Sequence, residues 1–86
     1  MQFEGAVIRE QGVTFAVVVV RKLVIDHGPE ADRAIRTFSG AFPGLPVVLM
    51  AQDGRGSPTY YGRPDLSRFL ANTPLGAIPW RRYTLN

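Results

Sequence analysis

The 86-residue chain contains no cysteine. This absence excludes disulfide bonds, thiol catalysis, thiolate metal sites and iron–sulfur clusters, and it is typical of a protein in a reducing compartment. There is a single histidine, His27, which also excludes a metal site built from several histidines. We therefore expect no bound cofactor or metal.

Long apolar segments are missing as well. The apolar run at residues 15–20 ends at Arg21 and Lys22, far short of the roughly 18 residues that a membrane-spanning helix needs. The N-terminal residues have neither the basic nor the apolar segment of a secretory signal. These features predict a cytoplasmic protein without a membrane partner.

Lysine is scarce, because Lys22 is the only lysine among the ten basic residues and the other nine are arginines. Together with seven acidic residues this gives a formal net charge of +3. Basic chains often bind nucleic acids, but a small protein with so modest a charge can simply be soluble. We favour the second interpretation.

The chain nevertheless has the apolar content of a folded domain. Hydrophobic residues make up 45% of the sequence and charged residues 20%, a balance typical of globular rather than disordered chains. A length of 86 residues is that of one domain. We expect residues 1–86 to form a single domain with its own core.

The strongest structural signal is the uninterrupted apolar run at residues 15–20, which contains four valines. Such a strand must be covered on both faces. Residues 3–9 alternate and are followed by a break at residues 10–12, so the pattern predicts a β-hairpin over residues 3–25. A second hairpin is predicted over residues 46–61, with its turn at residues 53–56.

Two helices are predicted, over residues 29–41 and 64–72, each with a proline in its first turn. In the first helix, Asp32 and Arg36 have the i, i+4 spacing of an ion pair. The fold class is therefore α/β (α+β), in the order β-β-α-β-β-α. We expect a two-layer sandwich, in which both helices cover one face of a mixed four-stranded sheet. An extended C-terminal tail, residues 73–86, or a second subunit would cover the other face.

The segments 44–50, 61–62 and 65–70 place a proline before an apolar strand, a hairpin next, and a glycine before the last helix. In this order, residues 13–70 resemble the C-terminal part of a thioredoxin-like domain. The corresponding proline of that family is usually cis, and the sequence leaves open whether the peptide bond between Leu45 and Pro46 is cis. The Cys-x-x-Cys unit of that family is absent, so redox activity is not implied.

Aromatic residues and arginines are grouped at residues 60–63 and 80–83. Aromatic rings stack on unpaired bases and arginines bind phosphates, but tyrosine, tryptophan and arginine also dominate protein–protein contacts. The structural alternative is that the rings pack on the core. Because strand residues alternate in direction, we expect only one of Tyr60 and Tyr61 to face a core. The candidate binding residues are Tyr61, Arg63, Trp80, Arg81, Arg82 and Tyr83.

Catalysis has one candidate pair, Asp26 and His27, in which a histidine could act as a general base. No serine of the chain stands in a nucleophile motif, and aspartate and histidine are ordinary residues before a helix. Residues 53–57 are glycine-rich like an anion-binding loop, but they join two predicted strands, so a hairpin turn is favoured.

The sequence therefore predicts a non-enzymatic binding domain with a protein partner, which could be a second copy of the chain in a homodimer. The alternative is weak binding of single-stranded nucleic acid through the Tyr/Trp/Arg residues. Hydrolase-type catalysis at Asp26 and His27 is the third hypothesis.

Overall fold

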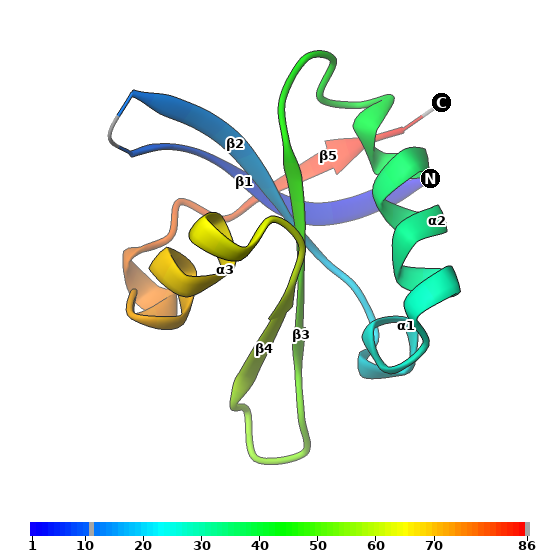
Figure 1. The fold of residues 1–86 in the computed structure, drawn as a ribbon, viewed down its shortest axis with the longest axis vertical. Helices are drawn as coiled ribbons and strands as arrows, with labels where there is room; N and C mark the ends of the chain where they lie inside the picture. Colours follow the sequence, from blue (N-terminus) through cyan, green and yellow to red (C-terminus); the bar gives the residue numbers. More distant parts are fainter. Residues whose placement is uncertain (11, 86) are drawn as a thin grey trace.

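A computed structural model describes residues 1–10 and 12–85. One mixed sheet of five strands forms the centre, in the order β4-β3-β2-β1-β5 (Figure 1). The strands are β1 (Gln2–Glu10), β2 (Val13–Val19), β3 (Val47–Gln52), β4 (Pro58–Tyr61) and β5 (Arg81–Thr84). The helices are α1 (Lys22–Asp26), α2 (Gly28–Ser39) and α3 (Pro64–Ala71), followed by the 3-10 turn η1 (Leu75–Ala77).

Both predicted hairpins are present. β1 pairs antiparallel with β2, and β3 pairs antiparallel with β4. β2 and β3 are parallel neighbours, joined through α1 and α2, with Ala16 opposite Val47. The mixed sheet predicted from the sequence is thus confirmed.

The sheet has five strands, however, and the prediction of four is wrong. Residues 81–84 of the predicted tail form β5, which pairs antiparallel with the first half of β1. The pairing places Tyr83 opposite Phe3, and their rings stack at 5.7 Å between centroids. One aromatic residue between charged and polar neighbours is too weak a pattern to predict a strand, and the partner at β1 decides it.

The predicted hairpin at residues 3–25 is too long. β2 ends at Val19, and residues 22–26 form helix α1, in which Ile25 is buried and Leu23 is exposed. An ion pair between Lys22 and Asp26 joins the two ends of this short helix. Short apolar runs such as residues 23–25 fit a strand or a helix equally well, and the prediction of a strand here is wrong.

Helices lie on both faces of the sheet rather than on one, so the two-layer prediction is also wrong. α1 and α2 cover the face on which Ala16 and Val18 lie, and α3 and η1 cover the face of Phe15 and Val17 (Figure 1). The apolar run of β2 is therefore buried on both sides within a single chain. A second subunit is not needed to cover it.

The sequence left open whether the peptide bond between Leu45 and Pro46 is cis. Among the described residues no peptide bond is cis, so this bond is trans. The carbonyl oxygen of Pro46 accepts a hydrogen bond from the N–H of Ala16 at 2.9 Å. Pro46 thereby contributes to the parallel pairing of β2 with β3 at its start.

Candidate binding site

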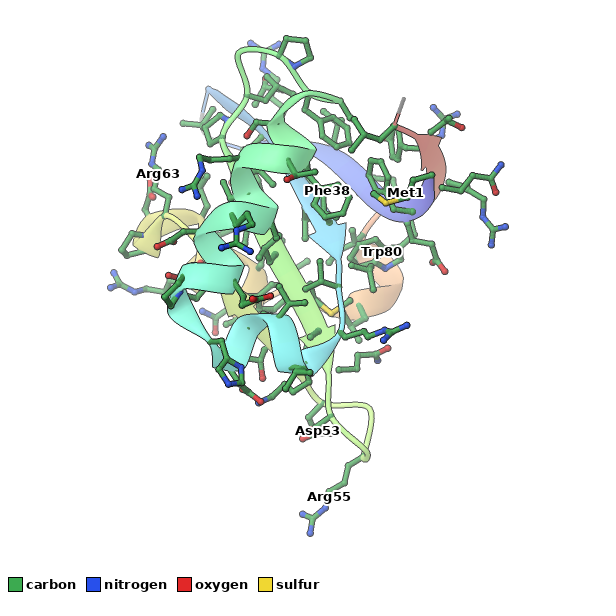
Figure 2. The ribbon with its side chains drawn as sticks, turned by 90° about the vertical axis from the view of Figure 1, so that its right-hand side faces the viewer. Met1, Phe38, Asp53, Arg55, Arg63 and Trp80 are labelled. Carbon is green, nitrogen blue, oxygen red and sulfur yellow. The ribbon has the colours of Figure 1, made fainter. Side chains whose placement is uncertain are left out.

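The six candidate residues lie at the two opposite edges of the sheet. Tyr61 and Arg63 are in or next to β4, whereas residues 80–83 are in or next to β5. Four strand spacings separate these edges, which is about 19 Å. Figure 2 shows Arg63 and Trp80 on opposite sides of the molecule. The six residues therefore do not form one continuous surface.

At the β5 edge the two aromatic side chains are partly buried, and each packs against a hydrophobic core on one face of the sheet. The indole N–H of Trp80 donates a hydrogen bond to the carbonyl oxygen of Leu75 at 3.1 Å, and the ring packs on the α3 side of the sheet. The ring of Tyr83 meets that of Phe42 edge-on at 5.0 Å on the α2 side. Arg81 and Arg82 remain exposed. At this edge, therefore, the aromatic rings stabilise the fold, and of the candidate residues only the two arginines are exposed to solvent.

At the β4 edge a groove of about 580 Å³ lies between α2 and α3. It is open to solvent at the C-terminal end of β4, and helices from both faces of the sheet contribute to its walls. It is lined by Asp32 and Ile35 of α2, by Tyr60, Tyr61, Gly62 and Arg63 at the end of β4, and by Pro64 and Ser67 of α3.

The backbone N–H and C=O groups of Tyr60 point away from β3, toward the open edge of the sheet. The N–H of Asp53 donates to the carbonyl oxygen of Ser57 at 3.0 Å, which fixes that pair as a hydrogen-bonded position of the β3–β4 ladder. Hydrogen-bonded positions alternate along an antiparallel pair, so Thr59 and Tyr61 bond to β3. Tyr60, opposite Met50, directs its N–H and C=O outward. The described residues give these two groups no backbone partner.

Gly62 allows the chain to leave β4 beside this groove. Its φ is +151°, and a Cβ atom there would lie 3.2 Å from the Cα atom of Val48 and 3.3 Å from the carbonyl oxygen of Val47. A side chain would therefore need both an unusual backbone conformation and space that β3 occupies. The glycine brings the start of α3 close against the sheet and so defines one wall of the groove.

Both tyrosines of β4 pack on a core, one on each face of the sheet. Tyr61 lies on the α2 side and Tyr60 on the α3 side. The prediction that only one of them faces a core is wrong, because helices cover both faces. Burial raises the pKa of Tyr60 above the ordinary tyrosine value.

The hydroxyl group of Tyr61 donates a hydrogen bond to Oδ1 of Asp32 at 2.9 Å. This hydrogen bond is the main reason why the pKa of Tyr61 is raised, and burial and the negative charge of Asp32 add to it. The predicted ion pair between Asp32 and Arg36 is absent among the described residues. A hydrogen bond to a carboxylate is stronger than an exposed i, i+4 pair, so the carboxylate turns toward β4.

Arg63 forms an ion pair with Asp65. Its guanidinium donates two hydrogen bonds to the carboxylate of Asp65, at 2.9 and 3.0 Å. These bonds are the largest cause of the lowered pKa of Asp65. The positive charge of Arg63 is thus compensated within the chain.

The candidate catalytic pair is not assembled. The carboxylate of Asp26 accepts a hydrogen bond from Lys22, and Nδ1 of His27 donates to the carbonyl oxygen of Leu23 at 3.0 Å. The hollow beside His27 is otherwise lined by Leu23, Val24 and Glu30, none of which is a nucleophile of the serine or cysteine type. In residues 1–10 and 12–85, no group of three or more potential metal ligands occurs.

The glycine-rich segment 53–57 forms a hairpin turn, as predicted. Oδ1 of Asp53 accepts hydrogen bonds from the backbone N–H groups of Arg55 and Ser57, at 2.8 and 3.0 Å. Donors that could bind an anion are therefore occupied by this carboxylate. Figure 2 shows Arg55 at the tip of the hairpin, pointing away from the body of the molecule.

Comparisons with known proteins give no relative: no family model, no curated protein and no solved structure matches the chain significantly. None of the helices in the described part of the chain has the length and apolar character required to cross a membrane.

Proposed function

We propose that the chain is a protein-binding domain that accepts an extended segment of a partner protein as an additional strand beside β4. The observation that carries this proposal is the outward direction of both backbone groups of Tyr60, a residue that lines the groove between α2 and α3. In strand addition, backbone hydrogen bonds supply affinity, and hollows beside the edge strand select alternate side chains.

The composition of β4 supports this role. Pro58–Tyr61 contains no charged residue, and the adjoining walls offer Ile35 and Pro64 as apolar surface. Charged residues at a sheet edge are a common device against unwanted strand pairing. β4 has no such charged residue. Its proline is the first residue of the strand, so it prevents strand pairing at that end only.

A different protein suits this edge better than a second copy of the chain. Two copies of β4, paired antiparallel about Tyr60, would place Pro58 opposite Gly62. Proline has no N–H group, so each end of such a pair would lack one hydrogen bond. The burial of β2 within one chain also removes the sequence-based reason to expect a homodimer.

The test is a selection of random short peptides displayed on phage, followed by NMR titration of the labelled protein with the selected peptides. Tyr60→Pro removes the outward N–H without removing a bond to β3, and Tyr60→Ala removes the ring but keeps the N–H. We expect the proline variant to bind at least about tenfold more weakly than the alanine variant, since it loses the hydrogen bond from this N–H and its ring occupies the space beside the added strand.

Arg82→Pro is the matched control, because Arg82 also lies at a position of an edge strand that points away from its neighbour. This variant should bind the selected peptides as the original chain does. Equal affinities of Tyr60→Pro and Tyr60→Ala, or shifts confined to β5, would refute strand addition at β4. Doubling of the mass in light scattering, lost in Tyr60→Pro, would instead identify the occupant as a second copy.

A further inference from the structure

We infer that the partner segment carries a lysine or arginine side chain, which Asp32 and Tyr61 bind on the α2 side of the groove. This inference rests on the proposed strand addition at β4 and specifies its partner. Three observations support this inference. They are the direction of the Asp32 carboxylate, the charges around it, and the geometry of an added strand.

The carboxylate of Asp32 is directed toward the groove. Arg36 lies one helical turn along α2, in the position for an ion pair, yet Asp32 instead accepts the hydrogen bond of the Tyr61 hydroxyl. A carboxylate oxygen can accept more than one hydrogen bond, and the second oxygen accepts none from the described residues. Tyr61 thus orients Asp32 and leaves acceptor capacity at the groove.

No cation of the described residues forms an ion pair with Asp32. Arg33 lies near Glu30, and Arg63, the only basic residue that lines the groove, is bound twice to Asp65. The groove therefore carries an uncompensated negative charge in a chain whose formal net charge is +3. Electrostatic complementarity favours a cationic group in the occupant at this point.

An added strand would present its side chains alternately to the two walls. Those on the α2 side meet Asp32, Ile35 and the ring of Tyr61, and those on the α3 side meet Pro64 and Ser67. Same-side residues of a strand are two positions and about 6.6 Å apart, and long side chains can span the difference from the roughly 4.5 Å that separates Asp32 and Ile35 along the helix axis. The expected pattern is a basic residue and an apolar residue two positions apart.

The cation would also lie beside an aromatic ring. A lysine or arginine next to the ring of Tyr61 gains a cation–π contact in addition to the ion pair. The hydroxyl of Tyr61 donates to Asp32, so the face of the ring is the part of the phenol that remains for a cation. The two residues therefore act as one unit, with Tyr61 as a positioning residue for the carboxylate.

The experiment compares the peptides that the phage library yields on the original chain, on Asp32→Asn and on Glu30→Gln. Glu30→Gln is the matched control, because it removes an acidic residue from the same helix that lies outside the groove lining. We expect lysine or arginine to be enriched at one position on the original chain and on Glu30→Gln, and not on Asp32→Asn. A selected peptide should bind Asp32→Asn about fivefold more weakly, as for a partly exposed ion pair.

The outcomes separate this inference from the proposed function. Peptides that depend on the Tyr60 N–H but show no basic enrichment would overturn the inference and leave strand addition intact. Basic enrichment that persists on Asp32→Asn would also overturn it. If no peptide distinguishes Tyr60→Pro from Tyr60→Ala, the proposed function itself fails. Tyr61→Phe should reduce the preference for a basic residue without abolishing binding of the peptide backbone.

Discussion

The two edges of the sheet have opposite designs. β5, at one edge, has two adjacent arginines, Arg81 and Arg82, and its aromatic neighbours are used to complete the two cores. β4, at the other edge, has no charged residue, and its last two residues line a groove between two helices. Both strands have only four residues, so length does not distinguish them. The two strands differ in side-chain charge and in the presence of a groove beside the strand.

The difference indicates which edge is open to a partner. An arginine at an exposed edge keeps its charge in water and would lose hydration if another strand were added. The outer half of β1, which extends beyond β5, follows the same rule, because Arg9 is two positions along the strand from the exposed Val7. Of the edges described, β4 alone combines an uncharged strand with an adjacent groove.

If the two edges differ as described, the aromatic residues near β5 stabilise the fold and do not bind a ligand. Trp80→Ala should lower the free energy of unfolding by about 2–4 kcal/mol, since it removes a large half-buried ring and one hydrogen bond. Urea denaturation followed by circular dichroism measures this loss. A change below about 0.5 kcal/mol would instead leave Trp80 available as a surface for ligands.

A second test concerns Gly62, which fixes the end of β4 against β3. Gly62→Ala should destabilise the fold by about 1–3 kcal/mol, because the alanine combines a positive φ with a contact of 3.2 Å to Val48. Gly76, before β5, has open space where a Cβ atom would lie and no unusual φ, so Gly76→Ala should change stability by less than about 1 kcal/mol. Similar losses in both variants would show that the close approach at Gly62 is not required.

The smallest effect is expected in the titration of Tyr61. Its pKa is raised by the hydrogen bond to Asp32, so the stabilisation is present below the ordinary tyrosine pKa and is lost as pH rises through the higher, folded value. Asp32→Asn should lower the pKa of Tyr61 toward its ordinary value. An ultraviolet titration of phenolate formation detects the change, and an unaltered curve would contradict the assigned hydrogen bond.

Much of the fold could be predicted from the sequence, and the failures have a common cause. The apolar run of β2, the turn residues and the spacing of apolar residues in α2 are local signals, and the elements they predict are present. β5 and α1 depend on partners distant in sequence, or on a short ambiguous run, so local patterns misplace them. The face of the sheet on which α3 packs is likewise a matter of tertiary contacts, which the apolar spacing of the helix does not reveal.

The candidate site could be predicted only in part. Tyr61 and Arg63 stand out in the sequence by residue type, and they line the groove. Local spacing pairs Asp32 with Arg36 and does not reveal its role at β4, because 29 residues separate it from Tyr61. The outward direction of the Tyr60 backbone follows from the register of the ladder, which a single sequence does not reveal.

The two-sided burial of β2 has a consequence for how the domain unfolds. Phe15 and Val17 belong to the core beneath α3, whereas Ala16 and Val18 belong to the core beneath α2. The two cores therefore share one strand, and neither can be dismantled without exposing residues that support the other. We therefore expect the domain to unfold as one cooperative unit, although α2 and α3 cover opposite faces of the sheet.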